Sequence, residues 1–354
     1  MPQCKALINH MCSTVTGSWR PCCRFENFEY FDASLVNFSE YKKSKFYQNI
    51  ITLMENDWHP GCIKCKLEEE IEHGSLREEM NRGLSGTPNV IESLELSPSN
   101  KCNLACKMCS PSYSTTWQHM IKKNKLDIEI TNEWGATYNK PLSIDQVFVD
   151  VDISNLKLIK YLGGEPFIMP ETEELFKFLD KQNIIQNIDF ETATNVTVFP
   201  KKLLKYLKKF KKVFIEFSIE GIGEVGEYIR YGKPWKIIDK NIKKWVENKS
   251  DNMELSTFTT VQAYNIHHIH EIKEYAKQND LKFYSSVLRV PEYLSVNVLP
   301  KNYIDKIRNK NNEKYLKQYK EDKKNRKKFI SYTNVMDSIT NLNINNIINY
   351  EYIS

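Results

Sequence analysis

The pattern of apolar and polar positions is most regular in the middle of the chain, where strand-like segments alternate with segments of helical period. The predicted strands are 91–97, 157–162, 188–195, 213–220, 254–262 and 282–290. Each of the first five is followed by a predicted helix, in order 112–123, 170–183, 200–210, 234–249 and 266–279. Strands joined in this way by helices are typical of βα units, so the sequence predicts an α/β fold with a parallel sheet.

Six βα repeats are too few to close an eight-stranded barrel, so we expect a partial (β/α)6 TIM-like barrel over residues 90–299. Residues 124–156 are longer than a simple connection, and we expect an extra helix there. A C-terminal helical extension is predicted over 300–354, and its end, from Asn334, is expected to pack loosely.

The C-terminal extension is rich in lysine. Residues 301–328 carry twelve basic and four acidic side chains, and 201–212 form a second lysine-rich run. Both runs have two interpretations that the sequence leaves open. They are solvated faces of amphipathic helices, or a positive surface that binds RNA or an acidic peptide.

Composition excludes a membrane-spanning protein. The 354 residues have a formal charge of +5 and a mean hydropathy of −0.54. No apolar run approaches the roughly 18 residues that a membrane helix needs. The first ten residues contain no apolar core of signal-peptide length, so the expected location is the cytoplasm.

The nine cysteines all lie at or before Cys109, which is the most informative feature of the composition. A secreted disulfide framework would not crowd into one third of a chain of this length. Short paired spacings in a cytosolic protein favour metal binding instead. Residues 1–89 therefore read as a small Cys-rich module that precedes the barrel.

Three of these cysteines, Cys102, Cys106 and Cys109, form a C-x3-C-x2-C loop directly after the first predicted strand. Soft thiolates match iron and sulfide, and three thiols on one loop can converge on one cluster. Three ligands for four irons leave one iron open to a substrate, as at catalytic zinc sites. A zinc loop or a chance cluster is the alternative.

This loop, with the apolar Met108 before its last cysteine, resembles the signature of radical S-adenosylmethionine (SAM) enzymes. The resemblance implies a catalytic [4Fe–4S] cluster on the three cysteines, with SAM bound at the open iron and near Met108. It implies reductive cleavage of SAM to a 5′-deoxyadenosyl radical that abstracts hydrogen from a substrate. It also implies the partial barrel and an electron donor such as flavodoxin or ferredoxin.

Further cofactor contacts follow from the same resemblance. The end of the second predicted strand, Gly163-Gly164-Glu165-Pro166, matches the GGEP motif, which in that family holds the amino group of SAM. Arginine suits the carboxylate of the cofactor, because its guanidinium can donate two parallel hydrogen bonds. The contacts implied at or after the later strands are Asn195, Ser218, Glu220, Arg230 and Val261. Ordinary strand alternation, and core packing for Val261, are the alternatives.

The N-terminal cysteines show a second pattern. Cys4, Gly17 and Cys22 form C-x12-G-x4-C, and Cys62 and Cys65 form a C-x2-C pair after a turn. Two such pairs can complete a closed four-ligand site. The pattern resembles the SPASM and twitch modules, which usually follow the barrel and hold an auxiliary [4Fe–4S] cluster. A zinc site of the same four cysteines is the alternative. Cys23 in place of Cys22 also stays open, and Cys12 is left over.

These observations favour a radical SAM enzyme. Auxiliary-cluster modules often accompany peptide or protein substrates in related enzymes, so a peptide or protein is the expected substrate. The alternative is a non-catalytic zinc or iron–sulfur protein that binds nucleic acid through its basic C-terminal helices. His267, His268 and His270 crowd the start of one predicted helix, and we expect them on a solvated face.

Overall fold

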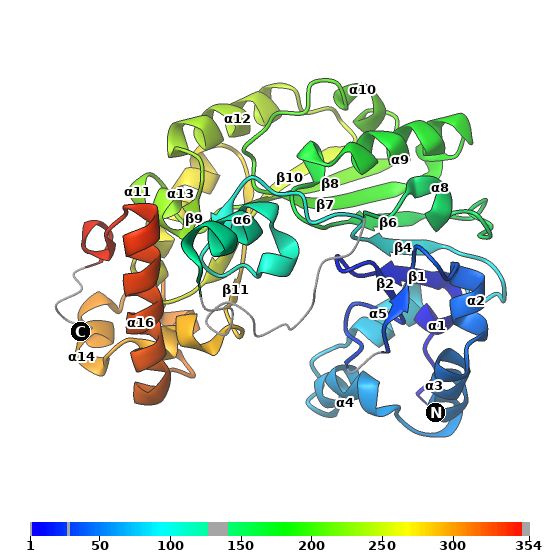
Figure 1. The fold of residues 1–354 in the computed structure, drawn as a ribbon, viewed down its shortest axis with the longest axis horizontal. Coiled ribbons are helices and arrows are strands. Elements are labelled where there is room, and N and C mark those ends of the chain that lie inside the picture. The colour runs from blue at the N-terminus through cyan, green and yellow to red at the C-terminus, as the bar shows by residue number, and fades with distance from the viewer. Residues whose placement is uncertain (1, 27–28, 127–140, 349–354) are drawn as a thin grey trace. The chain divides into compact units, whose positions relative to one another are not determined.

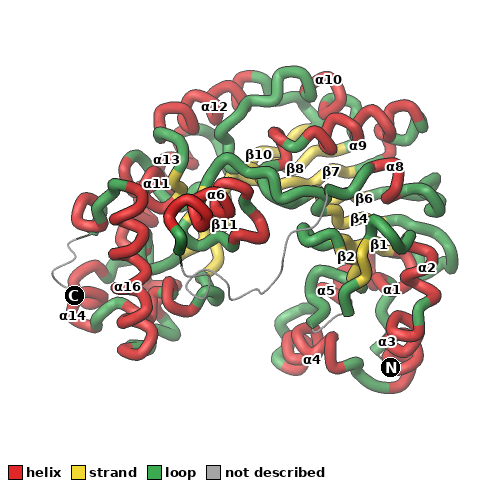
Figure 2. Tube along the Cα trace, viewed as in Figure 1, coloured by secondary structure: helices red, strands yellow, loops and turns green. Residues whose placement is uncertain are grey.

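The computed structural model describes residues 2–26, 29–126 and 141–348, which form two compact units (Figures 1 and 2). Each unit is assembled from several stretches of chain. Unit 1 comprises Met1–Lys101, Ala136–Thr192 and Lys201–Phe214, and unit 2 comprises Cys102–Gly135, Ala193–Pro200 and Ile215–Ser354. The N-terminal cysteines thus share a compact unit with part of the predicted barrel. The domain boundaries expected after residues 89 and 299 stay predictions.

Unit 1 is built on a mostly parallel sheet in which neighbouring strands follow the order β7-β6-β4-β1-β2-β3. Strand β4 pairs parallel with both β1 and β6, and β6 pairs parallel with β7. Strands β2 and β3 continue the edge in antiparallel register. The strands are β1 (His10–Ser13), β2 (Ser18–Arg20), β3 (Phe31–Asp32), β4 (Ser93–Leu96), β6 (Leu158–Tyr161) and β7 (Asp189–Thr194), the last ending in unit 2.

Helix α9 packs on strand β7, in which buried and half-buried residues alternate. Phe190 of β7 is fully buried, and its ring centroid lies 5.1 Å from that of Phe176 in α9. Phe148, at the end of α8, stacks on Phe178 of α9. The helices of unit 1 are α1 (Ala6–Asn9), α2 (Phe38–Lys43), α3 (Lys45–Asn56), α4 (Ile63–Glu70), α5 (Leu76–Gly83), α8 (Ile144–Val147), α9 (Pro170–Lys181) and α10 (Leu204–Leu207).

Unit 2 contains the later βα repeats and a small separate ribbon. Strand β10 pairs parallel with β11 over six residues and also neighbours β8. Strands β5 and β9 form a two-stranded antiparallel sheet. The strands are β5 (Ala105–Cys106), β8 (Lys212–Ser218, which begins in unit 1), β9 (Arg230–Tyr231), β10 (Met253–Val261) and β11 (Lys282–Val287).

The helices of unit 2 are α6 (Thr115–Asn124), α11 (Glu224–Ile229), α12 (Trp235–Glu247), α13 (Ile269–Gln278), α14 (Lys301–Ile307), α15 (Glu313–Leu316) and α16 (Lys323–Thr340). Single 3-10 turns across both units are Pro60–Cys62, Pro111–Tyr113, Pro166–Ile168, Ile185–Asn187, Ile266–His268, Glu292–Leu294, Val296–Val298 and Ile344–Asn346. The α/β fold class with a mostly parallel sheet is confirmed, and so are the six predicted strands to within a few residues at each end.

Of the expectations for the segment 124–156 and for the C-terminal end, the first is confirmed and the second is wrong. The extra helix expected within 124–156 is present as the short α8, although residues 127–140 lie outside the described residues. The loose tail expected from Asn334 is wrong up to residue 348, because Met336, Ile344 and Ile348 are buried. Residues 349–354 lie outside the described part. Among the described residues, no helix has the length and apolar character to cross a membrane.

Candidate functional site

The cysteine loop of unit 2 is held at both ends by the start of helix α6. Ser114 caps this helix by accepting a hydrogen bond from the Trp117 amide. The Cys102 carbonyl accepts from the hydroxyls of Thr115 and Thr116 at 3.0 and 2.8 Å. The indole of Trp117 donates to the Cys106 carbonyl at 2.8 Å. The sequence folds here into a loop in which the start of the following helix binds the Cys102 and Cys106 carbonyls.

The three thiols of the loop share one electrostatic environment. Burial raises the pKa of Cys106 well above its ordinary value and raises the pKa of Cys109 to about 12. The Cys102 thiol raises both pKa values further, and the Arg230 guanidinium lowers both. None of the nine cysteines forms a disulfide within the described residues. Buried thiols that repel one another as thiolates bind well to a cation, which stabilises all three at once.

Arg230 is fixed beside this loop by backbone pairing. In the β5–β9 ribbon Arg230 is the direct partner of Cys106. Its Nη1 lies 2.5 Å from Oε2 of Glu220, whose side chain is 2% exposed. The Arg230 Nε is buried and has no hydrogen-bond partner among the described residues. A buried guanidinium with a donor left over, next to three thiols, suits an anionic group of a ligand.

A hollow of about 310 Å³ in unit 2 lies against these residues. Asn195 is in its wall and donates from Nδ2 to the Cys102 Sγ at 3.7 Å. The hollow also has an apolar side that Leu104 and Trp235 contribute. Its lining residues are Leu104, Asn195, Ser218, Ile219, Gly221, Gly226, Glu227, Arg230, Lys233, Trp235 and Ile238.

Three of the cofactor contacts expected from the sequence therefore line one cavity: Asn195, Ser218 and Arg230. Glu220 reaches it indirectly through its ion pair with Arg230. Val261 is 0% exposed and does not line this hollow, and its backbone pairs with β11. The sequence missed Lys233 and Trp235, although their short distance from Arg230 along the chain was a usable signal.

The Gly-Gly turn belongs to unit 1 and follows β6. Gly164 donates its amide to the Ser99 carbonyl at 3.0 Å, and Glu165 donates to Lys101 at 2.9 Å. A Cβ at Gly163 would lie 2.5 Å from the Ser99 oxygen, and Gly163 has φ +128°. Both glycines are therefore needed where two backbone segments touch. Pro166 starts a 3-10 turn, and Glu165 caps it through a carboxylate oxygen 3.2 Å from the Phe167 amide.

Lys107 and the last helix brace the cysteine loop from its other side. The Lys107 side chain is fully buried, with Nζ 4.0 Å from the ring centroid of Tyr228 and 3.8 Å from Asp337. Burial lowers the pKa of Lys107 to about 8, against the opposing effect of Asp337. Tyr332 of α16 donates its hydroxyl to the Lys107 carbonyl at 2.6 Å. Met108, the next residue, is half-buried.

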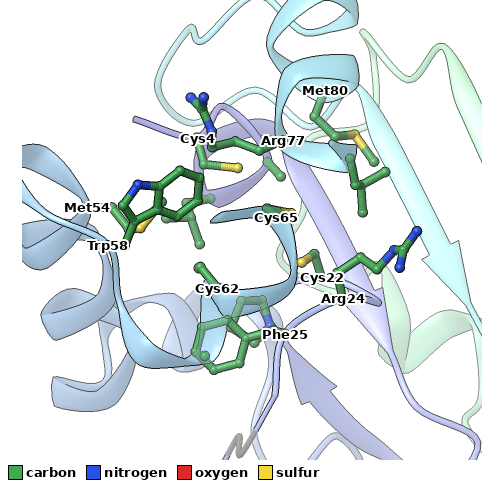
Figure 3. A pocket seen from close by; sticks show the side chains of 15 residues that line it. Cys4, Cys22, Arg24, Phe25, Met54, Trp58, Cys62, Cys65, Arg77 and Met80 are labelled. Atoms are coloured by element: carbon green, nitrogen blue, oxygen red, sulfur yellow. The ribbon is translucent and has the colours of Figure 1, made fainter. Parts of the chain in front are cut away.

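The second cysteine group lies in unit 1, around a cavity of about 450 Å³ (Figure 3). Cys4, Cys22, Cys62 and Cys65 all line this cavity, so the structure brings together the four residues expected from their spacing. The apolar part of its wall includes Phe25, Met54, Trp58 and Met80. Four thiols around one largely apolar cavity form a donor set for zinc or for an iron–sulfur cluster.

The four thiols are also electrostatically coupled. Burial raises the pKa of each of them, that of Cys62 to about 12 and that of Cys22 well above its ordinary value. Thiolate charge on Cys4 raises the pKa values of Cys22 and Cys62 further. Cys23 is absent from the cavity wall and instead shares a hydrogen bond with Glu95. The geometry therefore favours Cys22 over its neighbour.

The fold is of the α/β class with a mostly parallel sheet, and its cysteine loop carries three electrostatically coupled thiols. A family model described as "Radical SAM superfamily" matches residues 96–276, just over half of the chain. The chain belongs to the radical SAM superfamily. It is a radical SAM enzyme, and this membership implies a [4Fe–4S] cluster and SAM as cofactors.

The individual relatives share only a modest sequence identity with this chain. The chain is 27% identical over 243 residues to the radical SAM cyclopropyl synthase TigE of Paramaledivibacter caminithermalis, covering 67% of this chain and 46% of TigE. It is 27% identical over 166 residues to the GTP 3′,8-cyclase of Campylobacter lari, covering 46% of this chain and 42% of that one. The matches thus span less than half of these curated relatives.

Two solved structures also resemble this chain. Native anSMEcpe with bound AdoMet has a TM-score of 0.44 and 19% identity, covering 70% of this chain and 60% of that one. Streptococcus suis SuiB bound to the precursor peptide SuiA has a TM-score of 0.37 and 15% identity, covering 89% and 65%. The family match does not favour the non-catalytic nucleic-acid-binding alternative.

Proposed function

We propose that Cys102, Cys106 and Cys109 hold the catalytic [4Fe–4S] cluster of this enzyme and that SAM occupies the hollow beside Arg230. The observation that carries this proposal is the pairing of Cys106 with Arg230 across the β5–β9 ribbon. It places a buried guanidinium, with one donor free among the described residues, next to three coupled thiols. The donor set fits the group, because thiolates suit a cluster and a guanidinium suits a carboxylate.

When bound, the cluster and SAM supply the electron transfer that makes a 5′-deoxyadenosyl radical, which abstracts hydrogen from a substrate. The chain contributes binding, orientation and exclusion of water. Arg230 holds the carboxylate of SAM, and the Glu220 carboxylate fixes the guanidinium plane through their ion pair. Asn195 and Ser218 supply polar groups in the same wall.

The remaining expected contacts are part of the same proposal. By resemblance, Gly163, Gly164, Glu165 and Pro166 are assigned to the amino group of SAM, and within unit 1 the glycine backbone closely approaches residues 99–101. Met108 is assigned as a contact of the cofactor by the same resemblance. Val261, fully buried in β10, is assigned there by resemblance only.

We also propose an auxiliary [4Fe–4S] cluster on Cys4, Cys22, Cys62 and Cys65, within a twitch-like module that precedes a partial (β/α)6 barrel. The shared cavity of these four thiols supports it. The expected substrate is a peptide or protein, since auxiliary clusters accompany such substrates in related enzymes. A flavodoxin or ferredoxin is the proposed electron donor.

Iron counting tests both cluster assignments. We expect anaerobic reconstitution to give about eight irons and eight sulfides per chain. The triple variant with Ala at Cys102, Cys106 and Cys109 should retain about four irons and lose reductive cleavage of SAM. If the parent protein and the triple variant both hold about four irons, the catalytic assignment of these three cysteines is wrong. If the parent protein holds about four irons and the triple variant holds none, the auxiliary-cluster proposal is wrong. The N-terminal cysteines would then be assigned to zinc.

A further inference from the structure

Two cysteines of unit 1, Cys12 and Cys23, belong to neither proposed cluster. Cys12 lies within β1 and is 0% exposed. Its direct neighbours across the sheet are Glu95 of the parallel strand β4 and Arg20 of the antiparallel strand β2. Residues paired directly across strands project to the same face of a sheet, so these three side chains form one row.

His10 adds a nitrogen donor to this row. It precedes Cys12 by two residues on β1, so both side chains lie on the same face. His10 is 2% exposed, and its Nδ1 lies 3.0 Å from the Ser93 hydroxyl. Its Nε2 has no hydrogen-bond partner in the part of the chain that the structure describes. A buried ring fixed at one nitrogen and unpartnered at the other is the usual arrangement of a metal-binding histidine.

The donor atoms are close together. One ring nitrogen of His10, the Cys12 Sγ and one Glu95 carboxylate oxygen all lie within 4.8 Å of one another. Ligand atoms around a tetrahedral zinc ion are about 3.5 Å apart, given bond lengths of about 2.0–2.3 Å. Small side-chain adjustments, on the order of 1 Å, would therefore bring the three donors to a common ion.

Cys23, in the turn after β2, lies outside this group of three donors but beside Glu95. It shares a hydrogen bond with the Glu95 carboxylate, and its charge is coupled to that of Cys12. The adjacent Cys22 lines the other cavity. Two successive cysteines thus face two different groups of thiols.

The charges around the row also fit a divalent cation. Two thiolates, one carboxylate and a neutral imidazole carry three negative charges, which a divalent cation reduces to one. Arg20 supplies the remaining positive charge, because its Nε donates to the Cys12 Sγ at 3.3 Å and its Nη2 lies 3.7 Å from Glu95. Hydrogen bonds to ligand atoms of this kind fix their orientation and tune the metal.

We propose that His10, Cys12, Cys23 and Glu95 form a further metal site, for a divalent transition ion such as zinc. Mixed sulfur, nitrogen and oxygen donors in a four-ligand set suit zinc. A closed set of this kind is structural: it joins β1, β4 and the turn after β2. The site goes beyond the proposed function and does not depend on it.

The test uses the full chain with its iron sites loaded. Protein reconstituted anaerobically with iron and sulfide is incubated with zinc, dialysed and analysed for both metals. We expect about one zinc per chain beyond the iron. X-ray absorption at the zinc edge should show about two sulfur ligands near 2.3 Å and two lighter ligands near 2.0 Å. An all-sulfur zinc environment, or no retained zinc, would overturn the proposal.

Variants separate this site from the cavity of four cysteines. Cys12→Ser and His10→Gln should each lose the zinc and keep the iron count of the parent protein. Cys62→Ser should keep the zinc and lose iron, and His73→Gln, an exposed histidine of the same unit, should change neither. Equal zinc in all four variants would also overturn the proposal. If circular dichroism shows that a variant does not fold, the X-ray absorption spectrum of the zinc in the unmodified protein is the test of the proposal.

Discussion

Cys106 and Arg230 lie directly opposite each other in the antiparallel pair of β5 and β9. The Lys107 amide donates to the Ile229 carbonyl at 2.9 Å and extends the same ribbon by one step. A cluster ligand and the cofactor-binding arginine of the proposal are therefore fixed to each other by backbone hydrogen bonds. Changes to the side chain of Arg230 should affect ligand binding without displacing the cysteine loop.

Arg230→Lys tests this separation. Lysine keeps the positive charge but lacks the planar guanidinium group. It therefore cannot reproduce the geometry of the ion pair between Arg230 and Glu220. We expect SAM affinity to fall by about tenfold or more in equilibrium dialysis, with iron content per chain unchanged. Arg308→Lys, at an exposed ion pair with Glu313, is the matched control and should bind SAM normally. Unchanged affinity in the Arg230 variant would contradict its assigned role.

The neighbouring cysteines Cys22 and Cys23 give a second prediction. Cys22 lines the cavity of four thiols and Cys23 does not. Cys22→Ala should reduce the iron of the reconstituted protein from about eight to about four per chain, and Cys23→Ala should leave it at about eight. Iron and sulfide analysis measures the difference. The opposite result would make Cys23 the ligand.

Gly164 gives a prediction about stability. An added Cβ there would lie 2.5 Å from the Lys101 carbonyl oxygen, so Gly164→Ala forces two backbone segments apart. We expect the free energy of unfolding to fall by on the order of 2 kcal/mol in denaturant titration, together with weaker SAM binding. Gly83→Ala, with nothing within 4 Å of the new methyl group, is the control and should be neutral or slightly stabilising. Equal behaviour of the two variants would remove the close approach as the reason for this glycine.

His267 predicts a pH dependence of stability in unit 2. Burial, with a smaller contribution from charge on His268, lowers the pKa of His267 to about 4 from an ordinary value of 6.5. The unfolded chain therefore binds a proton below pH 6.5 that the folded chain binds only near pH 4. Stability from this residue is complete above pH 6.5 and is lost as the pH falls to about 4, by on the order of 3 kcal/mol.

Denaturant unfolding of His267→Gln at several pH values measures this effect. The variant should lose less stability than the parent between pH 6.5 and 4, because glutamine does not titrate. His73→Gln, at an exposed histidine, should follow the parent curve. Parallel curves for the parent and the His267 variant would show that folding does not lower the pKa of this ring.

The main strands could be predicted because their burial alternates with the sequence pattern. In β10, residues from Met253 to Val261 alternate between buried and half-buried positions, and the predicted range differs by one residue at each end. Strand β1 was missed because it is short and its pairing with β4 joins residues about eighty positions apart. The helix expected over 200–210 is shorter in the structure, where it spans Leu204–Leu207 with turns on either side. Long-range pairing and short elements leave no periodic signal.

The site was predictable where spacing carried the information. The cysteine spacings predicted the four residues that line the N-terminal cavity. The row of His10, Cys12 and Glu95 could not be found in the same way, because it depends on the register of two strands far apart in the chain. The solvated face expected for the histidine group is wrong for His268, whose Nε2 accepts from the Ile222 amide. Single polar contacts of this kind have no sequence pattern.

The contacts of α16 with the cysteine loop have a consequence for the order of assembly during synthesis. Tyr332 binds the Lys107 carbonyl across 225 positions of chain, and Asp337 faces the Lys107 ammonium group. A ribosome releases the loop long before it releases this helix. The loop therefore acquires its brace only when the helix has been translated, and a cluster inserted earlier would enter a loop that still lacks these contacts. The cysteine loop of the proposed iron site therefore reaches its final set of contacts only when this helix is complete.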